Sequence, residues 1–152
     1  MNIAFYIDEM NLRGVSNSTF NYAKFNKKIL KNKSFIFYNK KNYRNNNAII
    51  KKFKNYFKLI GVSNFKEIDL YQKKFKLDFI YTQKSGNKDD WVSSKIKTIV
   101  QSLYPQSISQ IHGYKYFFVS SWLSTKFSNG KIPHLPYIVN LGKTKKNLKK
   151  KL

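Results

Sequence analysis

Short apolar runs recur along this chain, separated by polar stretches in which apolar residues follow helical spacing. Continuous apolar runs bounded by turn residues are typical of strands buried on both faces of a sheet. The last run contains Pro133 and Pro136, which confine it to an edge or an irregular strand because proline donates no ladder hydrogen bond. The pattern predicts seven strands, namely Asn2–Ile7, Ser34–Tyr38, Lys58–Val62, Asp78–Thr82, Lys97–Gln101, Tyr116–Val119 and Ile132–Val139.

The polar stretches between these runs predict helices. Ser16 or Asn17 can cap a helix that continues to about Leu30, because such side chains accept hydrogen bonds from free N–H groups of the first turn. The Asp89-Asp90 pair suits the start of another helix, since negative charge is favourable at a helix N-terminus. Further helices are predicted over Ala48–Phe57, Phe65–Phe75 and Trp122–Phe127, the last capped by Ser120-Ser121.

The alternation of strands and helices indicates a mainly parallel sheet covered on both faces, as in doubly wound α/β domains. A chain of 152 residues fits one such domain. At this size folding buries roughly 68–70% of the surface of the unfolded chain, so a hydrophobic core can form. The 41% of hydrophobic and 17% of aromatic residues exclude a disordered polyelectrolyte.

The formal net charge of +23 invites a nucleic-acid interpretation, but its composition argues for a simpler one. Of the 30 basic residues only Arg13 and Arg44 are arginines, whereas nucleic-acid readers depend on the planar arginine fork. The abundance of Lys, Asn, Ile, Phe and Tyr is typical of a strongly AT-biased genome. We therefore expect a general solvated lysine surface, with a basic module that binds nucleic acid or an anionic membrane as the alternative.

Several protein classes are excluded or disfavoured by what the sequence lacks. The chain has no cysteine, which excludes disulfides and cysteine-ligated metals. No apolar run approaches the roughly 18 residues of a membrane span, and the first residues do not resemble a signal peptide. No Asp, Glu or His cluster has the spacing of a metal site. We expect a cytoplasmic protein, with peripheral membrane contact as an option, and no bound metal.

Ligands of doubly wound sheets bind beyond the carboxyl ends of the strands. The loop after the first strand, DEMNLRGVSNS, therefore places Arg13, Gly14 and Ser16 among the candidate binding residues. A glycine beside a helix N-terminus lets backbone N–H groups approach a phosphate or a sugar hydroxyl. The alternative is that Gly14 only makes the turn. The fingerprint G-x-G-x-x-G is absent, which weakens an NAD or FAD interpretation.

Later strands supply further candidates. Gln101 and Tyr104 lie at the end of the strand over 97–101, and Ser120 lies at the end of the next strand, where polar groups face the cleft in this fold. Each of the three could instead finish a strand or cap a helix. His112 could act as a base or hydrogen-bond a sugar because its pKa lies near neutrality, or it could be structural.

Two other patterns carry less weight. Asp8 and Glu9 could form acid–base machinery, but adjacent strand residues point to opposite faces, so we expect no shared role. The segment Gly142-Lys143-Thr144 imitates the end of a phosphate-binding P-loop, but Tyr137 stands where that motif needs its first glycine. We do not interpret it as a P-loop.

Taken in order, these features resemble the N-terminal domain of glycosyltransferases with the GT-B fold, of the group-1/family-4 type. The resemblance lies in NIAFYIDEMNLRGVSNSTFNYAKF, in the strand–serine–helix unit YFFVSSWLSTKF and in the closing strand at PYIVNL. It covers residues 1–141, and residues 142–152 would be a lysine-rich tail or the start of an interdomain linker. It implies a Rossmann-like three-layer α/β/α domain with a mainly parallel sheet of about seven strands.

The resemblance also implies a function. Such enzymes transfer a sugar from a nucleotide donor to an acceptor across a cleft between two domains, and the N-terminal domain receives a sugar or lipid-linked acceptor. This chain would be the acceptor-side half, with no tightly bound cofactor, and a nucleotide-sugar donor is expected only with a second domain. Self-association or a separate donor domain would complete it. The implied substrate-binding residues are Arg13, Gly14, Ser16, Gln101, Tyr104 and Ser120, with His112 as the catalytic candidate.

Overall fold

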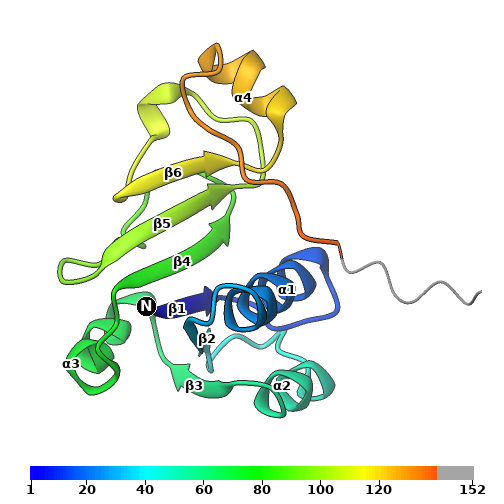
Figure 1. Ribbon diagram of the computed structural model, residues 1–152, viewed down its shortest axis with the longest axis vertical. Coiled ribbons are helices and arrows are strands. Elements are labelled where there is room, and N and C mark those ends of the chain that lie inside the picture. Colours follow the sequence, from blue (N-terminus) through cyan, green and yellow to red (C-terminus); the bar gives the residue numbers. More distant parts are fainter. Residues whose placement is uncertain (140–152) are drawn as a thin grey trace, which may run out of the picture.

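A six-stranded, fully parallel sheet forms the centre of the molecule (Figure 1). The computed structural model describes residues 1–139. The strand order is β3-β2-β1-β4-β5-β6, so the chain runs outward from β1 to one edge and then returns to continue from β4 to the other. The strands are β1 (Asn2–Ile7), β2 (Lys33–Asn39), β3 (Lys58–Val62), β4 (Phe79–Lys84), β5 (Lys97–Ser102) and β6 (Lys115–Phe118).

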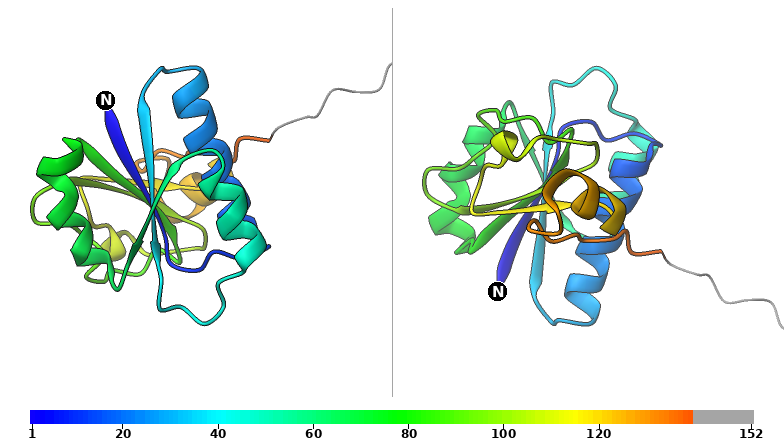
Figure 2. Two further views of the ribbon diagram at one scale, coloured as in Figure 1. Left: turned by 90° about the horizontal axis from the view of Figure 1, so that it is seen from below. Right: turned by 90° about the horizontal axis from the view of Figure 1, so that it is seen from above.

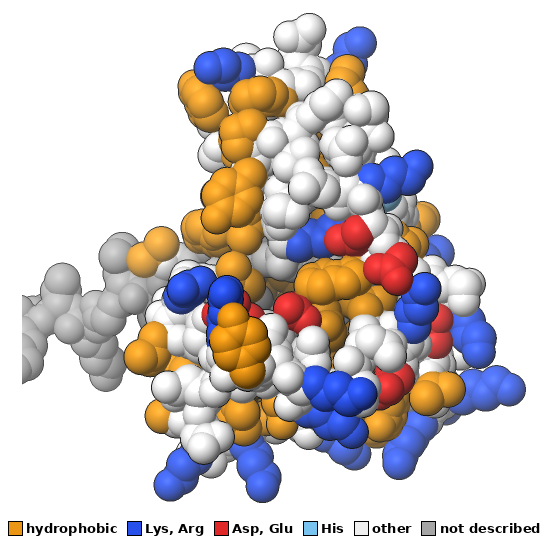
Figure 3. Space-filling view, turned by 180° about the vertical axis from the view of Figure 1, so that it is seen from behind, with side chains coloured by type: hydrophobic (Ala, Val, Ile, Leu, Met, Phe, Trp, Pro, Cys, Tyr) orange, Lys and Arg blue, Asp and Glu red, His pale blue; other side chains and the backbone are white. Residues whose placement is uncertain are grey.

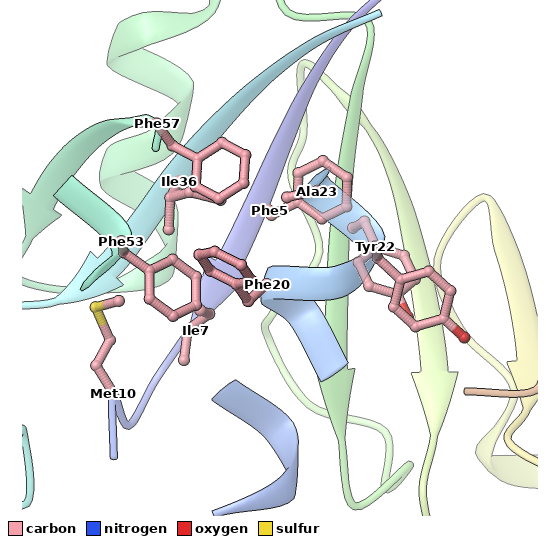
Figure 4. Packing of buried hydrophobic residues seen from close by; sticks show 10 residues of the cluster. Phe5, Ile7, Met10, Phe20, Tyr22, Ala23, Ile36, Phe53 and Phe57 are labelled. Carbon is pink, nitrogen blue, oxygen red and sulfur yellow. The ribbon is translucent and has the colours of Figure 1, made fainter. Parts of the chain in front are cut away.

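Successive side chains of β1 enter two different cores, because strand residues alternate between the faces of a sheet. Phe5 and Ile7 pack into one cluster, which also receives residues of α1 (Gly14–Lys28) and α2 (Asn47–Lys54). Within it Phe20 of α1 meets Phe53 of α2 edge to face, with ring centroids 5.1 Å apart (Figure 4).

Ala4 and Tyr6 pack on the other face of the sheet. There they meet Phe65 and Ile68 of the 3₁₀ helix η1 (Phe65–Tyr71), which continues into the short helix α3 (Gln72–Phe75). Figure 2 shows α1 and α2 on one side of the sheet and α3 on the other. The domain is therefore a three-layer α/β/α structure of the Rossmann-like type, as predicted.

The remaining elements lie around β6. A third cluster joins Tyr116 and Phe118 of β6 to Leu123 of α4 (Ser121–Ser128). The side chain of Ser120 accepts a hydrogen bond from Leu123 N at 3.2 Å, which confirms the predicted cap. A short 3₁₀ helix, η2 (Ile108–Gln110), lies between β5 and β6. No helix within residues 1–139 combines the length and apolar character needed to cross a membrane.

The predicted seventh strand, Ile132–Val139, is not a strand. It makes one isolated bridge, between Phe118 and His134, and then leaves the sheet edge. Pro133 and Pro136 explain this, because neither has an N–H to donate to a ladder. The segment packs on α1 instead, where the hydroxyl of Tyr22 donates to the carbonyl of Pro136 at 2.6 Å.

Two of the predicted helix starts are wrong. The first helix begins at Gly14, with Arg13 in the N-cap position and without a side-chain cap, so neither Ser16 nor Asn17 caps it. The connection from β4 to β5 contains no helix at the Asp89-Asp90 pair. Asp89 instead bonds Lys84 and the amide of Trp91, which holds this connection as an irregular loop. The expected tail over 142–152 and the segment Gly142-Lys143-Thr144 lie outside the described residues.

Candidate functional site

A cleft of ≈ 630 Å³ opens at the carboxyl ends of β1, β4 and β5. β1 and β4 are neighbours in the sheet, and the strand order reverses between them. Open α/β sheets bind ligands at this kind of position because the loops on either side diverge to opposite faces. The cleft is lined by Asp8, Glu9, Asn11, Arg13, Gly14, Val15, Gln83, Lys84, Ser85, Asp89, Trp91, Leu103, Tyr104 and Tyr137.

Asp8 follows the last residue of β1 and is held by neutral hydrogen-bond donors. Its carboxylate accepts from the hydroxyl of Tyr6 at 3.1 Å, the amide of Asn39 at 2.9 Å and the amide of Asn42 at 3.1 Å. Burial, followed by the negative charge of Asp8, raises the pKa of Tyr6 far above its ordinary value. No basic side chain of residues 1–139 lies within ion-pair distance of Asp8.

Glu9 differs from Asp8 because two arginines neutralise it. Its carboxylate lies 3.8 Å from the guanidinium of Arg13 and 3.7 Å from that of Arg44. The Arg13 side chain is 74% exposed, so its ion pair contributes little to stability. The two adjacent acidic residues therefore present different chemistry to the cleft, one carboxylate with neutral donors and one with cations.

The wall from β4 contains a buried cation. The Lys84 side chain is 5% exposed, and its ammonium forms an ion pair with Asp89. The ammonium also lies 5.7 Å from the ring centroid of Trp91, within the range of a cation–π contact. Burial lowers the pKa of Lys84, and the hydrogen bond and charge of Asp89 oppose that shift.

Gln83 has an unsatisfied acceptor in the cleft wall. Its amide nitrogen lies 2.8 Å from the hydroxyl of Ser18 on α1 and 2.9 Å from that of Tyr81. Its carbonyl oxygen Oε1 is buried and has no hydrogen-bond partner among the described residues. An unpaired buried acceptor costs free energy, and this oxygen has almost no surface of its own, so it belongs to the wall behind the cleft.

The structure brings together three of the residues predicted from sequence. Arg13, Gly14 and Tyr104 all line the cleft. Ser16 lies next to it and shapes its wall, because its hydroxyl accepts from Asn11 N at 3.0 Å and donates to the carbonyl of Glu9 at 3.1 Å.

Gln101 and Ser120 lie elsewhere. Gln101 is fully buried on β5, where its oxygen accepts from Tyr81 and Gln83 and its nitrogen donates to the carbonyl of Leu135. Ser120 caps α4 and is not part of the cleft lining. In this structure Gln101 therefore ends up as a buried strand residue and Ser120 as a helix cap, which are the structural roles that the sequence left open as alternatives to ligand binding.

His112 is buried behind the cleft wall. Its side chain is 4% exposed, with Nδ1 2.6 Å from the carbonyl of Gln110 and Nε2 4.0 Å from the carboxylate of Asp89. Nε2 has no hydrogen-bond partner among the described residues. Burial lowers the pKa of His112, and the nearby Lys84 adds to this shift. His112 thus contacts the cleft only through Asp89.

The sequence reasoning missed the carboxylates as cleft residues. It placed Asp8 and Glu9 on opposite faces, but β1 ends at Ile7, so strict alternation no longer applies and both line the cleft. With Asp89, the cleft contains three of the seven acidic residues of the whole chain. On the face drawn in Figure 3, acidic side chains are visible among lysine and arginine side chains. For Asp8 and Glu9 the usable signal was their place directly after the first apolar run.

Acidic residues also raise the question of a metal. Within residues 1–139 there is no group of three His, Asp or Glu side chains that could hold a metal ion.

No protein-family model matches this chain, and comparisons with curated proteins and with solved structures likewise found no match. The residues of the cleft are therefore the basis for assigning a function.

Proposed function

We propose that this chain is the acceptor-side domain of a glycosyltransferase and that its cleft binds the acceptor sugar. The observation that carries the proposal is the combination, at the switch point of the sheet, of hydrogen-bond acceptors with exposed aromatic rings. The resemblance of residues 1–141 to such domains supports the same assignment. The nucleotide-sugar donor requires a second domain in this proposal.

The acceptors suit a ligand that donates many hydrogen bonds. Asp8 offers a carboxylate whose present partners are neutral donors. Ionised carboxylates accept at two oxygens with several lone pairs, so a sugar hydroxyl can join existing donors. A phosphate-rich polyanion would instead meet the Asp8 carboxylate, which has no cation within ion-pair distance among residues 1–139, and this argues against the cleft as a polyanion site.

The aromatic side chains suit the flat, weakly polar faces of a sugar ring. Trp91, Tyr104 and Tyr137 line the cleft, and the latter two are 61% and 44% exposed. Ring faces bury apolar surface while hydroxyl and indole groups at their edges still hydrogen-bond.

Tryptophan fluorescence provides a direct test. The chain has two tryptophans, Trp91 in the cleft and Trp122 on α4, so the substitution Trp122→Phe leaves one reporter at the site. Titration with neutral monosaccharides should change the Trp91 emission and saturate with a dissociation constant on the order of 1 mM. UDP-glucose should bind no more tightly than glucose, since in this proposal residues 1–139 form only the acceptor side.

Two tyrosine variants distinguish cleft binding from non-specific effects. Tyr104→Ala removes an exposed ring from the cleft and should weaken sugar binding roughly 5-fold or more. Tyr114→Ala removes a comparably exposed ring outside the cleft and should leave binding unchanged. Absence of saturable binding by every sugar, or equal effects of the two variants, would overturn the proposal.

A further inference from the structure

A second feature lies at the opposite end of the sheet, where β2 begins and α1 ends. The segment KKILKNK over 27–33 comprises the end of α1, the turn and the first residue of β2, and it projects from the body of the domain (Figure 2). Ile29 and Leu30 are 65% and 64% exposed there, although both are large aliphatic residues. Four exposed lysines, Lys27, Lys28, Lys31 and Lys33, surround them in sequence.

This turn is held in a defined shape. Lys31 adopts the left-handed conformation with φ 56°, which reverses the chain after α1. The amide of Asn26 donates to the hydroxyl of Ser34 at 2.9 Å, and the amide of Asn32 donates to Asn26 at 2.9 Å. The two aliphatic side chains are therefore presented by a braced turn and not by a loose loop.

Lysines from elsewhere in the chain extend the same surface. A groove of ≈ 430 Å³ beside the turn is lined by Lys27 and Lys33 together with Lys54 and Lys58, and the exposed ring of Tyr56 lies among them. None of the described residues lining this groove is acidic. We call this surface the basic tip; it comprises Lys27, Lys28, Ile29, Leu30, Lys31, Lys33, Lys54, Tyr56 and Lys58.

Lysine at the end of a helix has an ordinary structural role as well. Lys27 and Lys28 lie in the last turn of α1, where positive charge complements the helix dipole. That role does not account for Lys31 and Lys33, which lie outside helices, nor for the exposed aliphatic pair. Lys58 has a contact of its own, because its ammonium lies 4.6 Å from the ring centroid of Phe75. None of the six lysines takes part in an ion pair within residues 1–139.

We propose that the basic tip docks on an anionic lipid surface, with Ile29 and Leu30 inserted between headgroups and the lysines in contact with lipid phosphates. The charge is complementary to such a surface, and lysines near it strengthen binding by roughly 5-fold each. The tip lies at the amino ends of the strands, so a docked domain keeps the carboxyl-end cleft facing away from the lipid. This proposal does not rest on the function proposed for the cleft.

The aliphatic pair decides between lipid and nucleic acid as the occupant. Both surfaces are polyanionic and would attract the lysines equally. Only a bilayer offers an apolar layer beneath its charges, so only a bilayer rewards burial of Ile29 and Leu30. An exposed tyrosine such as Tyr56 also fits the headgroup region, where aromatic residues are enriched.

Vesicle co-sedimentation of the full chain tests the proposal. Phosphatidylcholine vesicles should bind little protein, and vesicles that also contain phosphatidylglycerol should bind it in a manner that weakens with salt. The double substitution Ile29→Asn and Leu30→Asn keeps the charge and should weaken this binding roughly 10-fold. Leu70→Asn is the matched control, because Leu70 is 75% exposed on η1 and away from the tip.

A charge-matched pair isolates the contribution of the lysines. Lys27→Gln with Lys28→Gln should reduce binding to anionic vesicles strongly, whereas Lys73→Gln with Lys74→Gln on α3 removes equal charge and should reduce it far less. Because the chain has no cysteine, Leu30→Cys permits labelling with a polarity-sensitive dye at one position. Its emission should shift to the blue when anionic vesicles are added.

Three results would overturn the proposal. One is equal vesicle binding by the tip variants and their controls. Another is the absence of any dye shift at position 30. The third is salt-sensitive binding to RNA that exceeds binding to anionic vesicles and is unaffected by the Ile29→Asn and Leu30→Asn pair, which would identify the lysines as a nucleic-acid surface.

Discussion

Lys84 and Asp89 form an ion pair in which the lysine side chain is 5% exposed and the carboxylate 37% exposed. The pair joins the end of β4 to the loop that follows it and forms part of the cleft wall. The lysine is much more buried than the carboxylate. Removal of the carboxylate would therefore leave the Lys84 ammonium as an unpaired, poorly hydrated charge, which destabilises the fold.

Substitution of Asp89 by Asn should therefore destabilise the domain. The free energy of unfolding should fall by roughly 1–3 kcal/mol at neutral pH, since the buried Lys84 ammonium loses its carboxylate. Urea denaturation measures this. The loss should shrink as the pH rises through the lowered pKa of Lys84, because a neutral amine needs no counter-charge.

The neighbouring residue provides the control. Asp90 pairs with Lys66 at 3.1 Å, but both side chains are about two-thirds exposed or more, so Asp90→Asn should change stability by less than about 0.5 kcal/mol. Equal losses in the two variants would mean that the Lys84 ammonium is hydrated in solution.

Gln101 is a second buried polar centre with a predicted effect. Gln101→Met keeps the side-chain length but leaves the hydroxyl of Tyr81 and the carbonyl of Leu135 without their partner. We expect a loss of roughly 1–3 kcal/mol in urea denaturation and faster hydrogen exchange at the Leu135 amide. Gln106→Met, at a more exposed position on the following loop, should change neither measurement.

Two glycines of the cleft loops should respond in opposite ways to alanine. Gly86 has φ +102°, and a Cβ there would lie 2.0 Å from the hydroxyl oxygen of Ser102, so Gly86→Ala should cost roughly 2–4 kcal/mol. Gly14 begins α1 with open space around its Cβ position, so Gly14→Ala should raise stability by up to about 1 kcal/mol. Thermal unfolding distinguishes them; stabilisation by Gly86→Ala would show that this turn differs in solution.

His112 should make stability depend on pH below neutrality. Its folded pKa lies below the ordinary value of 6.5, chiefly because of burial, so the unfolded chain takes up the proton more readily. The free energy of unfolding should therefore fall as the pH drops below about 6.5, by at most about 1.4 kcal/mol per pH unit from this residue. The decrease should level off below the folded pKa.

His112→Gln should remove part of this pH dependence, as measured by urea denaturation between about pH 7.5 and 5. His134→Gln, which changes an exposed histidine, should leave it intact. An unchanged slope in the His112 variant would place the acid sensitivity in other groups, such as the nearby Lys84 and Asp89 pair.

The strands were predictable because local pattern determines them. The runs Asn2–Ile7 and Lys58–Val62 form strands with those same bounds, since short apolar runs bounded by turn signals favour strands. The segment Ile132–Val139 was apolar enough for a strand, but its prolines removed the donors that pairing requires. The local pattern could not predict its contacts with α1, because the two segments are more than a hundred residues apart in the sequence.

The candidate site was predictable in place but not in composition. The topology rule put it beyond the carboxyl ends of the strands, where Arg13, Gly14 and Tyr104 now line the cleft. Which side chains face that cleft depends on where each strand stops. Gln83 and Lys84 are the last two residues of β4, and the sequence did not identify them as site residues. Their burial arises only when the sheet is assembled, so no local pattern indicates it.

By itself the sequence determined the fold class, most of the strands and the end of the sheet at which a site would lie. These follow from hydrophobic periodicity and from the chirality of parallel connections, which act over short stretches of chain. Only the tertiary structure decided that Asp8, Glu9 and Asp89 share one cleft, that His112 lies behind it, and that Ile29 and Leu30 remain exposed. Such facts depend on contacts between distant segments, and burial and charge pairing exist only once those segments have met.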